Sequence, residues 1–286
     1  MRSWFKVFLK GMFMGAADIV PGVSGGTIAL VTGIYERLIL AINNLLDTIL
    51  ECIKSFGSKE HRKRLKEKAK KNDLRFLATL GTGGTISFLL ISRIILEAIH
   101  AYPAYIFSFF GGLIIASAVM IYGHIRERNI GLAAAGIAGF AISIAVSSLN
   151  TLGSVHTLPV IFFSGFLGVC AMLLPGVSGS FVLLLLGQYE YMLSVLKNLV
   201  FAEIIVFVSG MAIGGLIMSK VIAYFLKKHE QKTISFLVGL MAGGVYLPVR
   251  NIMGVQGIFL NPVSVTLVII SGVAGLGMVF ALEKLK

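Results

Sequence analysis

Two copies of one short motif hold the residues best suited to bind a phosphate group. Pro21–Gly25 and Pro175–Gly179 share the letters Pro-Gly-Val-Ser-Gly. A Pro-Gly pair within an apolar segment breaks a helix, and the half-helix after the break directs unpaired N–H groups and its positive dipole end into the protein. Glycines let a phosphate approach the backbone, while hydroxyls donate further hydrogen bonds. We therefore expect a phosphate cradle formed by Ser24, Gly25, Gly26 and Thr27 from one copy, and by Ser178, Gly179 and Ser180 from the other. The alternative is that these small residues only permit close helix packing.

Three acidic residues accompany the motif copies. Asp18 lies three residues before Pro21, and Met172 occupies the corresponding place in the second copy. A carboxylate within a membrane is costly unless it is paired or protonated, so Asp18 is a candidate for proton coupling or for pairing with a cation. The alternative is a cap that binds free amides at the turn. Glu36 and Glu190 each follow a tyrosine and suit gating or proton exchange, or anchoring at the interface.

Few other side chains have a pattern that points to chemistry. Arg37 follows the first of the paired glutamates, and Arg93 and Arg250 lie within or at the ends of apolar spans. All three are candidates to bind the phosphate of an acidic headgroup. For Lys220, snorkelling to phospholipid is the favoured interpretation. The five histidines show no metal-ligand or nucleophile pairing, so we expect no metal, no cofactor and no catalytic residue.

Composition places these residues in a membrane protein. Of the 286 residues, 57% are hydrophobic and 13% are charged, and the mean hydropathy is +0.91. Such a chain has more apolar surface than a soluble domain of this size buries. The net charge of +12 gathers in short loops, which favours membrane topology over nucleic-acid binding. Apolar stretches predict spanning helices at Leu74–Leu96, Ala104–Gly123, Ile130–Leu149, Phe201–Leu226, Thr233–Val249 and Val263–Leu282.

The two segments that contain the motif are not expected to cross the membrane as single helices. Gly11–Gly33 and Pro159–Gly187 are each interrupted near the centre by Pro-Gly, which predicts two half-helices in a re-entrant hairpin. Residues Met1–Lys10 read as an interfacial amphipathic start. The basic linker Lys54–Arg75 is expected in the cytoplasm, with both termini on the same side.

Internal repetition predicts the architecture. Tyr35-Glu36 meets Tyr189-Glu190 at the motif's offset, and Ser108-Phe109 meets Ser235-Phe236 further along the chain. Each half then contains a broken hairpin, a short amphipathic helix and three transmembrane helices. Because three crossings are an odd number, the second copy is inverted. We expect an all-α polytopic membrane protein, a single domain of two inverted repeats, 1–150 and 151–286, as is typical of alternating-access transporters.

Two longer stretches carry a resemblance to a known family. Gly15–Thr27, followed by Gly33–Arg37, and the run Leu173–Ser180 resemble the PopT-like family of polyprenyl-phosphate translocases. The resemblance implies a multi-pass protein of a bacterial or archaeal plasma membrane that returns undecaprenyl phosphate from the outer to the inner leaflet for cell-wall synthesis. It implies a transporter and not an enzyme. No P-loop is present, so protons, the membrane potential or the lipid gradient would supply the energy.

Other functions use similar residues. The first motif is also similar to the Pro-Gly-x-Ser-Arg-Ser-x-x-Thr run of integral-membrane undecaprenyl pyrophosphate phosphatases, but Gly25 stands where their arginine would be. The clustered glutamates of those enzymes are missing too. Transport of another anionic lipid or of a small anion would use the same cradle and remains open, as does the oligomeric state.

Overall fold

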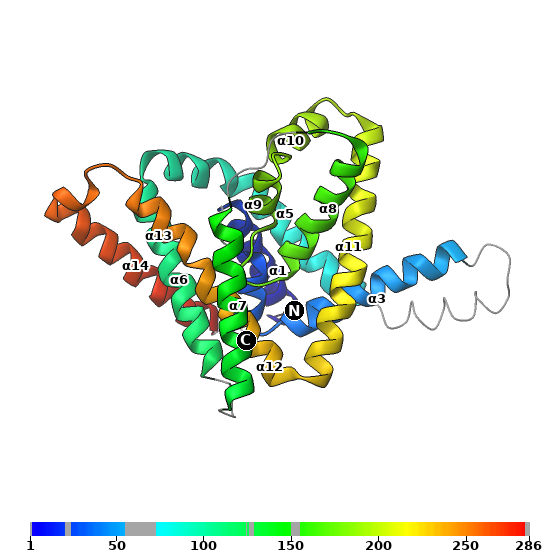
Figure 1. Cartoon of the computed structure of the whole chain (residues 1–286), viewed down its shortest axis with the longest axis horizontal. Helices are drawn as coiled ribbons and strands as arrows, with labels where there is room; N and C mark the ends of the chain where they lie inside the picture. The colour runs from blue at the N-terminus through cyan, green and yellow to red at the C-terminus, as the bar shows by residue number, and fades with distance from the viewer. Residues whose placement is uncertain are drawn as a thin grey trace.

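The computed structural model describes residues 2–20, 24–54, 73–123, 125, 129–149 and 155–283. Regular structure in these ranges is helical throughout (Figure 1). The predicted all-α polytopic class is confirmed. In the described ranges, six helical stretches are long and apolar enough to cross a membrane, as predicted. They are α5 (Leu74–Ala101), α6 (Pro103–Tyr122), α7 (Ile130–Ser148), α11 (Phe201–Lys228), α12 (Glu230–Gly244) continued by α13 (Tyr246–Met253), and α14 (Pro262–Glu283).

The surfaces of these spans require a lipid environment. Only 17% of the most apolar window of α11, and 17% of that of α14, is buried inside the protein. Large apolar side chains such as Ile205 on α11 and Phe280 on α14 point outward and are about two-thirds exposed. Because water would solvate such surfaces poorly, the bilayer covers them. The chain is therefore a multi-pass membrane protein.

Each motif segment forms two half-helices, as predicted. In the first half, α1 (Arg2–Ile19) is followed by α2 (Gly25–Val31), and in the second α8 (Leu158–Leu173) is followed by α9 (Gly179–Leu185). Ser24 and Ser178 cap α2 and α9 with their hydroxyl oxygens. Residues from Arg2 onward form the beginning of α1, and their predicted location at the membrane interface stays a prediction. Lys10 is buried, and its Nζ donates to the carbonyl of Thr32 at 2.9 Å.

An amphipathic helix follows each hairpin. Gly33 and Gly187 adopt φ of 71° and 65°, which lets the chain leave α2 and α9 sharply. The helices that follow are α3 (Tyr35–Lys54) and α10 (Tyr189–Lys197), and α10 lies bent by 104° from α9. Figure 1 shows α10 at the top of the molecule and α3 extending sideways lower down. The two equivalent helices therefore lie at different heights of the molecule.

A glycine makes the same backbone contact in each of the two halves. A Cβ on Gly11 of α1 would overlap the carbonyl oxygen of Leu80 on α5, and a Cβ on Gly165 of α8 would overlap that of Phe207 on α11. Each pair has equivalent positions in the two halves. Both hairpins therefore pack against the first span of their own half through the same close backbone approach.

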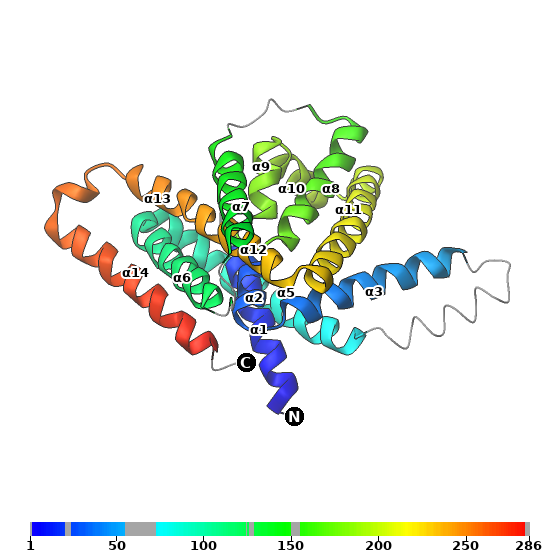
Figure 2. The same cartoon turned by 60° about the horizontal axis from the view of Figure 1, so that its bottom comes forward.

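The last spans are exchanged between the halves. In the first half, Ser108 of α6 donates to the carbonyl of Val268 on α14 at 2.7 Å, and in the second, Ser235 of α12 donates to Leu132 on α7 at 2.8 Å. Figure 2 shows α14 lying along α6. Each half thus contributes its final helix to the other, so the two repeats interlock. The boundary at 150 stays a prediction because residues 150–154 lie outside the described ranges.

The linker falls largely outside the described ranges as well. α3 ends at Lys54 and α5 begins at Leu74, with residues 55–72 between them not described. Its cytoplasmic location, like that of the termini, stays a prediction.

Candidate functional site

The residues that follow the first Pro-Gly pair contact the second Pro-Gly turn and the end of α8. The hydroxyl of Ser24 donates to the carbonyl of Leu174 at 3.3 Å, and the amide of Gly176 donates to Thr27 Oγ1 at 3.1 Å. The Tyr35 hydroxyl adds a bond to the Leu173 carbonyl at 2.9 Å. Ser24 and Thr27 are almost completely buried. These residues of the predicted cradle therefore join the halves.

The amides of the first turn are already bonded within the hairpin. Gly25 N–H donates to Asp18 Oδ1 at 2.7 Å, and Gly26 N–H donates to Ser24 Oγ at 3.2 Å. Thr27 N–H donates to the Ser24 carbonyl at 2.9 Å. An anion at this turn would have to replace Asp18 or Ser24. The bond from Gly25 to Asp18 is the capping contact that was the alternative interpretation of Asp18.

The second turn leaves more donors available. Ser178 Oγ accepts from Phe181 N–H at 3.4 Å and lies 2.9 Å from Ser180 Oγ. Within the part of the chain that the structure describes, the N–H groups of Gly179 and Ser180 have no acceptor. Both serines and Gly179 line a cavity of about 210 Å³, which also reaches Asp18 and Phe207. The donors of the predicted cradle that face open space thus belong to the second turn.

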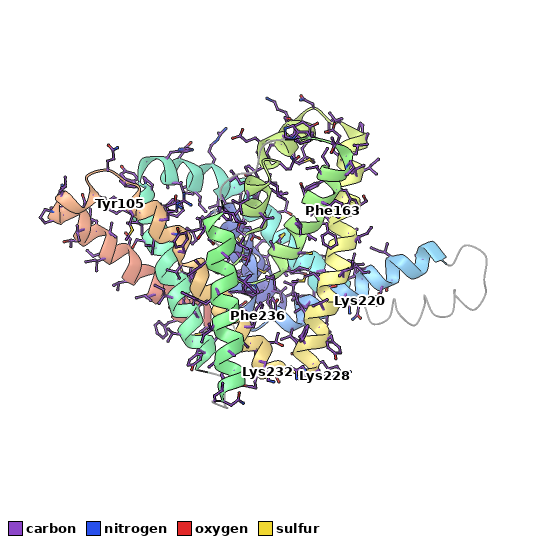
Figure 3. All side chains as sticks on the ribbon, viewed as in Figure 1. Tyr105, Phe163, Lys220, Lys228, Lys232 and Phe236 are labelled. Atoms are coloured by element: carbon purple, nitrogen blue, oxygen red, sulfur yellow. The ribbon has the colours of Figure 1, made fainter. Side chains whose placement is uncertain are left out.

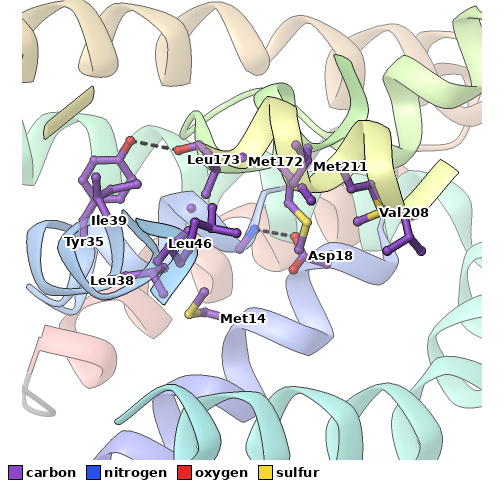
Figure 4. Close-up of a pocket in the computed structure, with 16 residues that line it drawn as sticks. Met14, Asp18, Tyr35, Leu38, Ile39, Leu46, Met172, Leu173, Val208 and Met211 are labelled. Carbon is purple, nitrogen blue, oxygen red and sulfur yellow. Dashed lines mark hydrogen bonds between the residues drawn. The ribbon is translucent and has the colours of Figure 1, made fainter. Parts of the chain in front are cut away.

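We call this space the polar cavity because Asp18, Ser178 and Ser180 line it, although the rest of its wall is apolar. A larger and more completely apolar cavity adjoins it. Its volume is about 450 Å³, and it lies between α1, α2 and α3 of the first half and α8 and α11 of the second. Asp18 is the one charged side chain on its wall among the described residues. The two cavities share Asp18, Val169, Met172 and Met211. Figure 4 shows Asp18 facing Met172 and Met211, so the carboxyl group marks the place where the polar and apolar cavities meet.

The predicted arginines lie elsewhere. Arg37 is exposed, bonds Asp73 Oδ2 through Nε at 2.6 Å, and places its guanidinium 4.2 Å from the Phe76 ring centre. Arg93 and Arg250 are exposed and have no hydrogen-bond or ion-pair partner among the described residues. The structure does not bring these three side chains to the junction of the two turns, and their part in phosphate binding stays a prediction.

The predicted glutamates also lie away from the turns. Glu36 is exposed on the first turn of α3, and Glu190 is exposed on the first turn of α10. Gating or proton exchange by either residue stays a prediction.

Sequence reasoning missed two contacts between the halves. Tyr35 recurs as Tyr189, but only Tyr35 is buried and bonds the opposite turn. Lys220, interpreted as a snorkelling residue, instead pairs its Nζ with Asp47 Oδ1 at 2.7 Å. The recurrence of tyrosine was a visible signal, whereas no pattern links Lys220 to Asp47.

Fold and site together define a multi-pass membrane protein with interlocked inverted repeats and a cavity between broken helices, an architecture typical of transporters. Residues 14–256 match the undecaprenyl phosphate translocase-like family. The chain is 35% identical over 241 residues to a polyprenyl-phosphate transporter of Vibrio cholerae, covering 84% of this chain and 76% of that protein. It is 30% identical over 273 residues to a polyprenyl-phosphate transporter of Staphylococcus aureus, covering 85% of each.

The chain belongs to the undecaprenyl phosphate translocase-like family. The family and both relatives are named as transporters and not as enzymes, which removes the phosphatase alternative. No solved structure matches the chain significantly.

Proposed function

We propose that this protein carries undecaprenyl phosphate, or a close polyprenyl phosphate, from the outer to the inner leaflet of the plasma membrane. The observation that supports the proposal most is the junction of a polar and an apolar cavity at Asp18, between the two halves. A phosphate needs hydrogen-bond donors inside a membrane because losing water without replacement costs several kcal/mol. A polyprenyl chain needs only apolar walls.

The polar cavity suits the phosphate end of such a lipid. Ser178, Ser180 and the free amides beside them offer donors without a full positive charge. Such a site holds the anion less tightly than a cluster of arginines would, which allows release. Rocking of the interlocked halves about the touching turns would then expose the site to each leaflet in turn.

Asp18 is our candidate for proton coupling. Its carboxyl group lines the same cavity as Ser178 and Ser180, and no cation pairs with it among the described residues. A phosphate and a carboxylate in one cavity repel each other strongly in a medium of low dielectric constant. A proton on Asp18 removes this repulsion, so binding of the lipid and of a proton would favour each other. Glu36 and Glu190 remain further candidates.

Transport of a small anion is the rival proposal, and the walls of the larger cavity argue against it. They consist of leucine, isoleucine, valine, methionine, alanine and glycine besides Asp18 and Tyr35. A small anion gains nothing from this apolar volume. Another anionic lipid would fit, and only its transport rate separates it from polyprenyl phosphate.

Reconstituted vesicles test the proposal. Labelled undecaprenyl phosphate is placed in both leaflets, and an external phosphatase removes the phosphate from the lipid in the outer leaflet at once. Lipid from the inner leaflet is cleaved only after it has crossed, so the slow phase of cleavage measures movement between leaflets. We expect the wild-type protein to increase the rate of this slow phase. The double variant Ser178→Ala/Ser180→Ala should reduce that rate about tenfold or more, because two hydrogen-bond donors to the phosphate are lost. The control is Ser194→Ala, an exposed serine on α10. Equal rates with and without protein would refute the proposal. Phosphatidylglycerol is a phosphodiester, so an external phospholipase replaces the phosphatase for it, and equal rates for this lipid would favour a general anionic-lipid carrier.

A further inference from the structure

A second polar cavity lies between α3 and the last turns of α11. Its volume is about 550 Å³, and α3 contributes Glu36, Ile39, Leu40 and Asn43 to its wall. From α11 come Lys220, Ala223, Tyr224, Leu226 and Lys227. Ile39 also lines the apolar cavity at the two turns, so the two spaces have a common wall. The apolar cavity thus adjoins the polar cavity at the second turn on one side and the α3–α11 cavity on another.

The polar groups of this cavity suit an anion. Two of its lining residues, Lys220 and Lys227, are basic, and one, Glu36, is acidic. Lys228 lies just outside the wall and donates from Nζ to the Tyr224 hydroxyl oxygen at 3.0 Å. That bond leaves the hydroxyl hydrogen of Tyr224 available and makes it a stronger donor.

Two further features of the cavity wall favour the binding of a ligand. The side-chain oxygen of Asn43 is buried and has no hydrogen-bond partner among the described residues. Because amide oxygen and nitrogen exchange places by a flip, Asn43 can also turn a donor toward an anion. Lys220 is held by Asp47, and the pair is partly exposed, so an arriving anion can compete for the lysine at little cost.

The two amphipathic helices pack differently in the two halves. α3 packs across the boundary between the halves onto α11, whereas its counterpart α10 packs on α9 and α11 of its own half. Arg93, which corresponds to Lys220, is exposed and has no partner in the described ranges. Figure 3 shows Lys220 on α11 level with α3, and Lys228 and Lys232 close together at the lower end of the view. The positive-inside rule predicts that this end faces the cytoplasm.

We propose that the α3–α11 cavity binds the phosphate monoester of a lipid in the inner leaflet, at the position from which the lipid is released. The inference rests on the proposed function. A phosphate monoester carries about −1.5 to −2 charges near neutral pH. It therefore matches two lysines better than the single charge of a phosphodiester headgroup. On arrival the phosphate takes Lys220 from Asp47, and the chain remains in the apolar cavity beyond Ile39.

Protection of engineered cysteines tests the site on the full-length protein. In a Cys52→Ser/Cys170→Ala background, Asn43→Cys reports on the α3–α11 cavity, and Met172→Cys reports on the junction at the turns. Farnesyl phosphate is the probe, and its effect on the rate of maleimide labelling is measured in nanodiscs. Farnesol tests the chain without the phosphate, inorganic phosphate tests the head alone, and phosphatidylglycerol tests a resident phospholipid. We expect farnesyl phosphate to protect both cysteines, and farnesol to protect Met172→Cys alone.

The outcomes separate the two proposals. Protection of Met172→Cys without Asn43→Cys would overturn the inner site and leave the proposed function standing. Protection of neither cysteine would count against both. Equal protection of Asn43→Cys by phosphatidylglycerol would overturn the assignment to a monoester and identify a site for resident phospholipid.

Substitution of Lys220 and of Asp47, the two members of the ion pair, should change the protection by farnesyl phosphate in opposite directions. In the Asn43→Cys protein, Lys220→Met should weaken protection by farnesyl phosphate about tenfold, because a charge-assisted bond is lost. Asp47→Asn should strengthen it, since Lys220 is then free to bind the phosphate. Lys232→Gln, at a basic residue of α12 outside the cavity, is the control and should change nothing. If Asp47→Asn and Lys220→Met weaken protection alike, the pair only braces α3 against α11 and the proposal fails.

Discussion

The contact between the two turns predicts a specific loss of stability when Thr27 is replaced by valine. Thr27 is fully buried, and its Oγ1 accepts the hydrogen bond from Gly176 N–H at 3.1 Å. Valine has almost the same shape but no acceptor, so the buried amide of Gly176 is left unpaired. An unpaired buried donor costs about 1–3 kcal/mol, and we expect Thr27→Val to lower the free energy of unfolding by that amount.

Thr32 offers a matched control. It is also buried, but its Oγ1 donates to the Ile28 carbonyl at 2.7 Å, and that carbonyl already accepts from the amide of Thr32 at 3.0 Å. Thr32→Val therefore leaves no group unpaired, and its cost should be about 0.5 kcal/mol or less. Reversible unfolding in mixed micelles with increasing sodium dodecyl sulfate measures both variants. If Thr27→Val is no less stable than Thr32→Val, the turns do not depend on this bond and the reasoning is refuted.

Three further predictions concern two close backbone contacts and the carboxyl group of Asp18. Gly176→Ala should lower the free energy of unfolding by several kcal/mol, because φ is +84° and the added Cβ would lie 2.6 Å from the Leu240 carbonyl oxygen. The control is Gly257→Ala, where φ is +74° and the space around the residue is open, so the change should cost only about 1 kcal/mol of backbone strain. Gly239→Ala should lower the free energy of unfolding, since its Cβ would overlap the backbone of α7. Gly81→Ala, on the open face of α5, is its control and should be neutral or raise the free energy of unfolding by about 1 kcal/mol. Asp18→Asn retains an acceptor for Gly25 but cannot carry a proton, so lipid movement in vesicles should lose its response to an imposed proton gradient; an unchanged response would transfer the coupling role to Glu36 or Glu190.

Much of the architecture was predictable because it depends on local pattern. Spanning helices need long apolar runs, and Pro-Gly breaks a helix whatever its surroundings, so the six spans and both hairpins followed from the sequence. The recurring Pro21–Gly25 and Pro175–Gly179 motifs also revealed the repeat. The exchange of α7 and α14 between the halves was not predicted, because small residues such as Gly136 and Gly272 do not specify which helix they approach.

The details of the site were less predictable because they depend on competition among neighbours. The motif identified free amides at both turns, but Asp18 and Ser24 occupy those of the first turn while Gly179 and Ser180 keep theirs. Which acceptor reaches an amide first is decided by tertiary packing. Likewise, charge alone suggested headgroup binding for Arg37, whereas in the fold Asp73, distant in sequence, lies beside it.

The most direct test of the account blocks the junction of the cavities with a bulky side chain. Met172 lines both cavities, and Leu167 on the same helix is exposed and lines neither. Movement of undecaprenyl phosphate between leaflets of reconstituted vesicles is measured for Met172→Trp and Leu167→Trp, with folding checked for each. We predict that Met172→Trp abolishes movement while Leu167→Trp remains close to wild type. Full activity of a folded Met172→Trp protein would contradict the claim that the lipid occupies the junction of the two cavities during transport.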